Sequence, residues 1–280
     1  MLVPRILTAL ALLAVLLPAL FHGDPRAFGV VTLALLTAGA WEWGRLNGLD
    51  MTGSLALGGA CLGLCLASWW LGWLDQALAP FWLVAGAAWV MLVIALLARG
   101  VTGWGQVAVG LRLLGGVLAL WVAWMAISRA RVIGINFLLS VLVLVWVADI
   151  GAYFSGRAFG RRKLAPAISP GKSWEGVWGG MLGVLVLAYT WRFFDQVWSA
   201  SVPSLYTRVS VQHAMLLPLV VVFMVAMSVC GDLVESLIKR AAGVKDSSGL
   251  LPGHGGVLDR VDALLPTLPA ALMLVTILGG

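Results

Sequence analysis

Two polar segments interrupt an otherwise apolar chain of 280 residues, and both carry side chains suited to phosphate chemistry. The second segment covers residues 232–262. In it, Asp232, Ser236 and Lys239 are spaced i, i+4 and i+7, so they share one face of a helix. Asp259 and Asp262, spaced i and i+3, share a face where the last apolar run begins. Such carboxylates suit Mg²⁺, which prefers carboxylate oxygens together with substrate phosphates. Helix capping by acids and ion pairing with neighbouring basic residues would explain the same pattern.

A glycine-rich stretch joins these two groups of carboxylates. Its polar and glycine residues include Lys245, Asp246, His254, Gly255 and Gly256. Glycines let the backbone approach a ligand closely, and successive backbone amides can bind phosphate. His254 could donate a hydrogen bond to a phosphate oxygen or could serve only in packing, and the sequence leaves both open. The Gly171-Lys172-Ser173 triplet lacks the upstream glycine of a P-loop, which excludes that motif.

The first polar segment, residues 149–176, is strongly basic. Its basic residues are Arg157, Arg161, Arg162, Lys163 and Lys172. Attraction to anionic lipids, about 1 kcal/mol per basic residue, explains such a cluster, and so would contact with a substrate phosphate. Asp149 is a functional candidate because it lies near the end of an apolar run, where an ionisable residue is costly. Glu175 either serves the substrate or only caps the next helix together with Ser173.

The amino-acid composition indicates that the elements that position both polar segments are transmembrane helices. Hydrophobic residues make up 61% of the chain and charged residues only 11%, whereas soluble domains carry about 25% charged residues. So little charge cannot cover a water-facing surface, and most of the surface must face lipid. The 15 Trp and 34 Gly residues agree, since Trp collects at membrane interfaces and Gly allows close helix packing. The three cysteines have no disulfide or zinc spacing.

Nine apolar runs approach the length of about 20 residues that a helix needs to cross a bilayer. They are expected near residues 4–21, 27–46, 54–74, 80–98, 106–128, 132–154, 174–194, 212–238 and 261–278. The first is interpreted as a retained helix, because an Ala-x-Ala cleavage site is missing. The first two runs are joined by only a few residues, so the prediction that each crosses the membrane completely is the least certain.

The predicted fold class is therefore an all-α polytopic integral membrane protein with about nine transmembrane helices. We expect about five in an N-terminal region, residues 1–130, and the others in a catalytic region, residues 131–280, with loops at 155–173 and 239–260. With nine spans, one side of the membrane collects 13 of the 18 Lys and Arg residues, including both polar segments. Because basic loops stay in the cytoplasm, the N-terminus and both segments are expected there.

The second polar segment resembles a family signature position by position. The matching positions read Ser-x-Ile-Lys-Arg at 236–240, Lys-Asp-x-Ser at 245–248 and Leu-Pro-x-His-Gly-Gly-Val-x-Asp-Arg-Val-Asp at 251–262. The stretch is similar to the phosphatidate cytidylyltransferase (CDP-diglyceride synthase) family. Residues 149–176 resemble a second stretch of that family, and Trp41-Glu42-Trp43 resembles its bacterial members. Gly171 and Ala263 stand where the family pattern has Lys and Ser.

The resemblance implies a nucleotidyltransferase of phospholipid biosynthesis that transfers CMP from CTP to phosphatidic acid, giving CDP-diacylglycerol and pyrophosphate. It implies Mg²⁺, with a second, monovalent ion left open, held by Asp232, Asp259 and Asp262. Lys239 and His254 complete the expected catalytic set. The residues expected to bind substrate are Ser236, Arg240, Lys245, Asp246, Gly255, Gly256, Arg260, Asp149, Lys172, Ser173 and Glu175.

In that reaction the lipid's own phosphate is the nucleophile, so the enzyme must mainly position two polyanions and neutralise charge at the α-phosphorus of CTP. The resemblance also implies the bacterial inner membrane, a homodimer and no nucleic acid partner. Two other classes remain as alternatives. A CTP-using polyprenol kinase would transfer the γ-phosphate instead. A secondary transporter is disfavoured, because the charges gather at one face and no internal repeat is visible.

Overall fold

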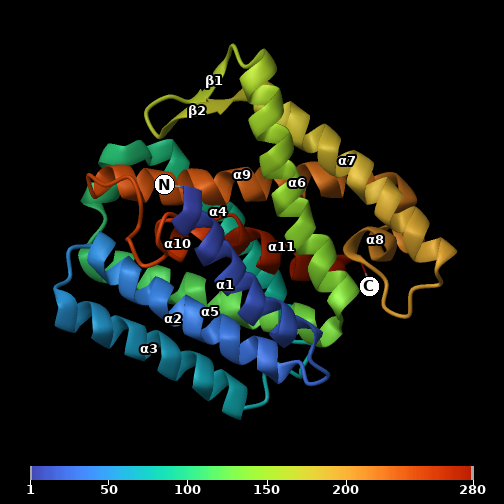
Figure 1. Ribbon diagram of the computed structural model, residues 1–280, viewed down its shortest axis with the longest axis horizontal. Coiled ribbons are helices and arrows are strands. Elements are labelled where there is room, and N and C mark those ends of the chain that lie inside the picture. The colour runs from blue at the N-terminus through green and yellow to red at the C-terminus, as the bar shows by residue number, and fades with distance from the viewer. Residues whose placement is uncertain (1, 279–280) are drawn as a thin grey trace.

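The computed structural model describes residues 2–278 and consists almost wholly of helices (Figure 1). Nine helical stretches among these residues are long and apolar enough to cross a membrane. The predicted class, an all-α polytopic membrane protein, is thereby confirmed, and the first two apolar runs form two separate spans.

The elements follow one another in a simple order along the chain. The helices are α1 (Leu2–Phe21), α2 (Arg26–Leu46), α3 (Met51–Trp70), α4 (Ala79–Gln106), α5 (Val109–Ile133), α6 (Ile135–Phe159), α7 (Trp174–Val197), α8 (Leu205–His213), the 3₁₀ turn η1 (Ala214–Leu216), α9 (Leu217–Ala241), α10 (Leu258–Val261) and α11 (Leu264–Ile277). Two short antiparallel strands, β1 (Lys163–Ala165) and β2 (Ser169–Ser173), form a hairpin between α6 and α7.

Several element boundaries differ from the sequence-based prediction. Helix α4 continues past a kink at Gly100, where φ is 67°, so the fifth span begins at Val109 and not near residue 106. The eighth apolar stretch starts at Leu205 with the separate helix α8, and α9 itself starts at Leu217. Helix α6 extends to Phe159, which shortens the first predicted loop.

The last apolar run is divided, which corrects the prediction for its two aspartates. Asp259 lies in the four-residue helix α10, whereas Asp262 follows that helix, before α11 begins. The two carboxylates therefore do not open one continuous helix, and they have different surroundings.

Helices α6 and α7 pack against each other and carry the hairpin between them at the top of the molecule (Figure 1). Glycines permit their close approach. A Cβ atom at Gly180 would lie 2.7 Å from the Ala148 carbonyl oxygen, and one at Gly176 would lie 2.8 Å from that of Ala152. Small residues at helix crossings are the usual means of packing helices in lipid, where burial of apolar surface gives no net drive.

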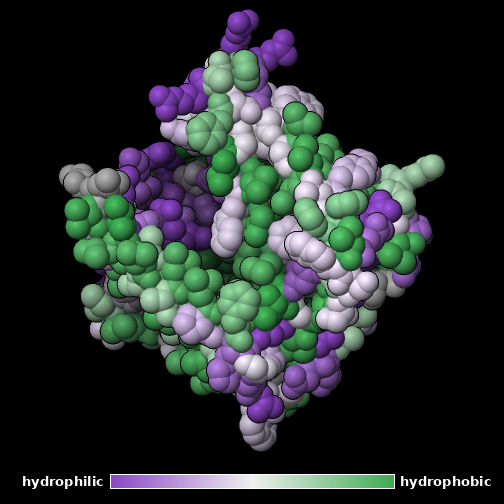
Figure 2. Space-filling model, turned by 45° about the vertical axis from the view of Figure 1, so that its right-hand side comes forward, coloured by the Kyte–Doolittle hydropathy of each residue, from purple (hydrophilic) through white to green (hydrophobic). Residues whose placement is uncertain are grey.

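The surface is mostly hydrophobic, as a lipid-facing protein requires, but one hydrophilic hollow lies below the projecting hairpin (Figure 2). Fully buried large side chains such as Trp124 of α5, Phe137 of α6 and Met224 of α9 form the packed centre. Helix α1 contributes little to that centre, since most of its side chains are exposed. The polar segments thus lie beside a rigid helical core.

Candidate active site

The two polar segments meet through an ion pair between the hairpin and α9. The Nζ atom of Lys172 lies 2.6 Å from Oδ2 of Asp232, and both side chains are partly exposed. Ser236, one helical turn after Asp232, donates its hydroxyl to Oδ1 of the same carboxylate at 3.1 Å. Asp149, exposed on α6, lies within electrostatic range of both members of the ion pair. The predicted relation of Asp232 and Ser236 is therefore observed, and Lys172 joins them from the other segment.

Local hydrogen bonds hold the hairpin in the shape that presents Lys172. Ser173 caps α7 by accepting a hydrogen bond from the Gly176 amide at 3.2 Å. Glu175 accepts hydrogen bonds from the amides of Arg161 and Arg162 at the other side of the hairpin, at 3.1 and 3.2 Å. The sequence left open whether Ser173 and Glu175 serve the substrate or cap the next helix. In the structure Ser173 caps α7, while Glu175 closes the hairpin.

Arg240 fastens the hairpin to the end of α9. Its Nε atom donates to the Ile168 carbonyl at 3.3 Å, and Nη1 donates to the Val244 carbonyl at 3.5 Å. Lys245 and Asp246, by contrast, are exposed on the loop that follows. The structure thus places Arg240 between the two segments and leaves Lys245 and Asp246 at the rim.

The carboxylate of Asp259 is fully engaged inside the protein. It accepts hydrogen bonds from Lys239 at 2.6 Å, from the Ser247 amide and hydroxyl at 2.9 Å each, and from the Gly256 amide at 2.7 Å. Lys239 is also ion-paired with Glu235, one turn earlier on α9. The Lys239 side chain therefore points toward Asp259 and Glu235. It lies on the same helix face as Asp232, as expected, but makes no ion pair with it among the described residues.

Glu42 of α2 holds the same loop from the opposite side. Its side chain is completely buried, and it accepts a hydrogen bond from the Ser248 hydroxyl at 2.5 Å. The Ser247 hydroxyl lies 3.1 Å from Glu42 and 2.9 Å from Asp259, so its single proton is shared between the two carboxylates. Glu42 also accepts from the amides of Val257 and Leu258, both at 2.9 Å. The glycine-rich loop is thus held at both of its ends by a residue from the first part of the chain.

These contacts change the expectation for the glycine-rich loop. Its successive amides do bind anionic groups, but at Gly256, Val257 and Leu258 those groups are the carboxylates of Asp259 and Glu42. The amides are therefore already occupied and do not form an open cradle for a phosphate. Gly255 has a φ of 78°, a conformation that favours glycine, and it lets the chain turn back at this point.

His254 lies at the tip of this loop beside Arg260. Arg260 donates to the His254 carbonyl through Nε at 2.9 Å and Nη2 at 2.6 Å. The Nδ1 atom of His254 is buried and has no hydrogen-bond partner among the described residues. On the outer side, Thr8 of α1 donates to the Pro252 carbonyl at 2.9 Å, so α1 supports the loop as well.

The three aspartates expected to hold Mg²⁺ do not meet at one point. Among residues 2–278 no three His, Cys, Asp or Glu side chains are grouped closely enough to hold a metal ion. Asp232 and Asp262 lie close enough for their charges to interact, and the one hydrogen bond that Asp262 accepts within residues 2–278 comes from the adjacent Ala263 amide at 2.8 Å. A pair of carboxylates of this kind fits Mg²⁺, which usually takes one or two carboxylates plus substrate phosphates. Asp259 would have to leave its present partners to join them.

Glu235 is a buried acid outside the set of site residues predicted from sequence. It forms an ion pair with Lys239, but neither carboxylate oxygen of Glu235 has a well-formed hydrogen bond among the described residues. Glu235 and Asp262 line a cavity of about 290 Å³ between α4, α5, α9 and α11. The site thus contains one more buried carboxylate than the sequence-based set.

An apolar groove of about 390 Å³ lies beside the glycine-rich loop. Leucine side chains of α1, α2, α6 and α11 line it, and Arg260 and Leu251 lie in the same lining. A groove with one cationic side chain among apolar ones is complementary to a phospholipid. The cation suits the lipid phosphate, and the apolar walls suit the acyl chains.

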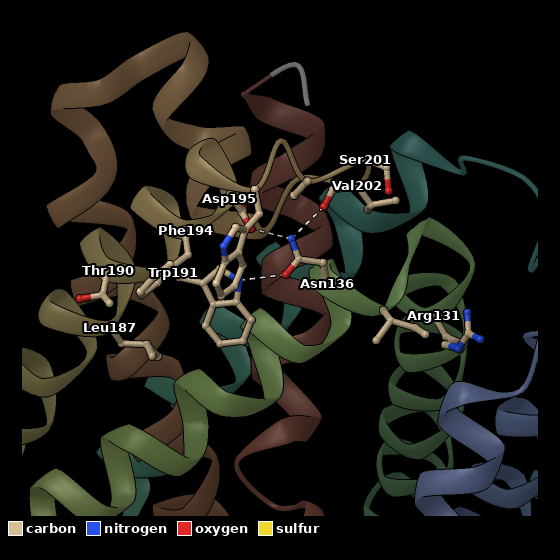
Figure 3. A pocket seen from close by; sticks show the side chains of 12 residues that line it. Arg131, Asn136, Leu187, Thr190, Trp191, Phe194, Asp195, Ser201 and Val202 are labelled. Carbon is tan, nitrogen blue, oxygen red and sulfur yellow. Dashed lines mark hydrogen bonds between the residues drawn. The ribbon is translucent and has the colours of Figure 1, made fainter.

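A second cavity, of about 640 Å³, lies at the opposite end of α6 and α7 (Figure 3). Its polar side chains satisfy one another. Asn136 donates to Asp195 and accepts from Trp191, at 2.8 and 2.9 Å. Asp195 also accepts from the Ser204 amide and the Thr207 hydroxyl, at 2.9 and 2.6 Å. This network joins the ends of α6, α7 and α8 and holds none of the predicted site residues.

Comparison with known proteins shows similarity over almost the whole chain. Residues 3–278 match the model of the cytidylyltransferase family. The phosphatidate cytidylyltransferase of Pseudomonas aeruginosa is 39% identical over 282 residues, which cover 98% of this chain and 97% of that protein. The phosphatidate cytidylyltransferase of Haemophilus influenzae is 38% identical over 288 residues, covering 96% of each chain. That of Bacillus subtilis is 42% identical over 136 residues, covering 49% of this chain.

Proposed function

The chain belongs to the cytidylyltransferase family and is a nucleotidyltransferase, and from this premise we propose that it forms CDP-diacylglycerol and pyrophosphate from CTP and phosphatidic acid. The observation that carries the proposal is the position of a charged site directly beside an apolar groove, with Arg260 belonging to both. Relatives that match almost the full length of the chain bear the same activity in their names.

The reaction joins an oxygen of the lipid phosphate to the α-phosphorus of CTP, and the bond from that phosphorus to the pyrophosphate oxygen breaks. Phosphatidate is already ionised at neutral pH, so the chain needs no nucleophile of its own. Its task is to bring two polyanions together and to balance the charge that develops, which is the main component of phosphoryl-transfer catalysis. Lys172, Lys239 and Arg260 provide the positive charge near the loop and α9.

The proposed cofactor is Mg²⁺, held by Asp232 and Asp262, with Asp259 as the third ligand. When bound, the ion would neutralise charge on the phosphates of CTP. Ser236 and Lys172 orient the Asp232 carboxylate through the contacts described above. His254 is a proposed hydrogen-bond donor to phosphate, and so is Ser236 when its hydroxyl turns from Asp232 to the substrate. The exposed Lys245 and Asp246 are proposed to contact the nucleotide at the rim.

The groove lined by α1, α2, α6 and α11 is the proposed seat of an acyl chain. Its walls are leucines on both sides, while Arg260 would face the lipid phosphate. An apolar groove favours an acyl chain through burial, about 0.8 kcal/mol for each methylene group removed from water. Because the groove borders the loop that contains His254, the lipid headgroup would enter the charged site from the side.

We further propose that the site faces the cytoplasm of a bacterial inner membrane. The distribution of basic residues supports this orientation, because 13 of the 18 Lys and Arg residues fall on the side of the hairpin and the glycine-rich loop. The homodimer expected from the family resemblance is retained as a proposal, and crosslinking in native membranes would test it.

The test uses purified protein, phosphatidic acid, Mg²⁺ and CTP labelled on either the α- or the γ-phosphate. Label from the α-phosphate should enter the lipid, and pyrophosphate should appear in equal amount. Label from the γ-phosphate entering the lipid would instead identify a kinase and contradict the proposal. An Asp232→Asn variant provides the control for contaminating activity, since it should retain the fold and transfer no label.

A further inference from the structure

Glu42 is an acid near the C-terminal end of the membrane-spanning helix α2, and no cation is paired with it among the described residues. A buried carboxylate is costly unless strong hydrogen bonds compensate for its lost hydration. Glu42 obtains three such bonds from Ser248, Val257 and Leu258 of the glycine-rich loop, and it shares the Ser247 hydroxyl with Asp259. The helix therefore retains a costly residue whose contacts all lie in the loop of the candidate site.

The four donors come from both ends of the loop. The hydroxyls of Ser247 and Ser248 belong to its start, and the amides of Val257 and Leu258 belong to its end. One side chain therefore links two points of the chain that are about ten residues apart, and the intervening turn with His254 is closed by that link.

The contact also connects Glu42 to the charged centre of the site. The Ser247 hydroxyl lies within hydrogen-bond distance of both Glu42 and Asp259, and Asp259 in turn accepts from Lys239. Gly256 lies in the same place, because a Cβ atom there would collide with the Glu42 carboxylate and the Ser247 hydroxyl. A change at Glu42 thus reaches Lys239 through three contacts in series, Glu42–Ser247, Ser247–Asp259 and Asp259–Lys239.

We propose that Glu42 is a positioning residue for cytidylyl transfer, which closes the loop of residues 247–258 and thereby orients Asp259 and Lys239. This inference rests on the proposed function for its catalytic consequence, but the closure of the loop does not depend on it. Glu42 does not contact the substrates in this role. It acts through the loop and through Ser247.

Substitution of Glu42 by glutamine tests this role, because a glutamine side chain has hydrogen-bond donors where glutamate has only acceptors. A carboxylate only accepts hydrogen bonds, whereas a glutamine amide group donates and would face an amide or hydroxyl that also donates. Aspartate keeps the charge on a side chain that is one methylene group shorter, so its oxygens cannot reach all four donors. Ser248→Ala removes a single bond and leaves the carboxylate in place. Thr37→Val on the same helix is the control, since the buried Thr37 hydroxyl has no hydrogen-bond partner among the described residues.

Three measurements on the full-length protein in detergent decide the question: kcat and KM for CTP and phosphatidic acid, amide hydrogen exchange, and the unfolding temperature. Glu42→Gln should lower kcat by about 10²-fold, the size of effect expected when catalytic groups are misplaced. Exchange should increase in residues 245–258 but not in α5 or α9. Glu42→Asp and Ser248→Ala should give intermediate kcat values, and Thr37→Val should match the wild type.

The outcomes separate this inference from the proposed function. If Glu42→Gln keeps the wild-type kcat and the wild-type exchange of the loop, the positioning role is wrong. If exchange increases equally in all helices and kcat falls only with the amount of folded protein, Glu42 is merely structural, and the inference is again wrong. If the wild type transfers no cytidylyl group, the proposed function fails, whereas a loop-specific increase of exchange in Glu42→Gln would still establish the closure.

Discussion

Lys172 of β2 and Asp232 of α9 form an ion pair with Nζ and Oδ2 2.6 Å apart, and this contact turns two distant polar segments into one site. The basic hairpin therefore does more than attract anionic lipids, because one of its lysines lies against a carboxylate expected to hold the metal ion. The remaining basic residues of the hairpin, such as Arg161 and Lys163, are exposed.

Lys172→Gln should lower kcat/KM about 10²-fold, because Asp232 loses the partner that orients it. The unfolding temperature should hardly change, since partly exposed ion pairs contribute only about 0–1 kcal/mol to stability. Lys163→Gln, on the exposed strand β1 of the same hairpin, is the matched control. Equal kinetics for the two variants would show that Lys172 serves only the general attraction of anionic lipid.

Asp259→Asn should leave a folded membrane protein that forms no CDP-diacylglycerol at any Mg²⁺ concentration. The variant removes a charge that is bonded to Lys239, Ser247 and Gly256, so both the loop and the proposed metal site are affected. Removal of a single electrostatic group of this type typically costs about 10²–10³ in kcat. Asp75→Asn, an exposed position outside the site, controls for the substitution itself. Wild-type turnover in Asp259→Asn would contradict the assignment of Asp259.

Removal of Mg²⁺ by a chelator should abolish transfer, and added Mg²⁺ should restore it. Binding of an ion to the folded state also raises the unfolding temperature by mass action, which gives a second measurement that does not depend on turnover. The Mg²⁺-dependent increase should disappear in Asp262→Asn, which lacks the carboxylate beside Asp232. An equal increase in Asp262→Asn and wild type would place the ion elsewhere.

Gly180→Ala should separate α6 from α7 and destabilise the protein by about 1–3 kcal/mol, the usual cost of overpacking. The added Cβ atom would lie 2.7 Å from the Ala148 carbonyl oxygen, which belongs to a backbone that cannot yield easily. The measurement is the unfolding temperature in detergent. Gly63→Ala in α3, where the added atom meets nothing within 4 Å, should be neutral or slightly stabilising, because alanine favours helix more than glycine does. An equal loss in both variants would contradict the packing argument.

Leu139→Trp should fill part of the apolar groove and raise the KM for long-chain phosphatidic acid, while the KM for a short-chain, water-soluble analogue stays the same. The reason is steric, since only the long acyl chain needs the groove. Leu118→Trp, at an exposed position of α5 away from that lining, is the control. An equal rise of KM for both lipids would indicate that the acyl chain lies elsewhere.

The membrane-spanning architecture could be predicted from sequence because apolar length alone determines whether a helix can cross a bilayer. The boundaries could not, for local reasons. The kink at Gly100 lets α4 continue, and η1 separates α8 from α9. In both places the helix continues into less apolar sequence, so the length of the apolar run does not reveal where the helix begins or ends.

The site was predictable only where its partners are close in sequence. Asp232 and Ser236 are one turn apart and do interact, as the helical spacing indicates. Glu42 and Ser247 are separated by 205 positions, and no spacing rule relates them. A signal did exist, however, since Glu42 is an acid inside an apolar run, the same criterion that singled out Asp149.

The polar network around Asn136 and Asp195 has a mechanical consequence for the opposite end of the molecule. It fixes α6, α7 and α8 to one another far from the hairpin. Glycines bring α6 and α7 into backbone contact along the way to the hairpin, so the two helices are joined to each other at several points of their length. The position of Lys172 against Asp232 therefore depends on two long helices packed as a pair and not on the short hairpin alone.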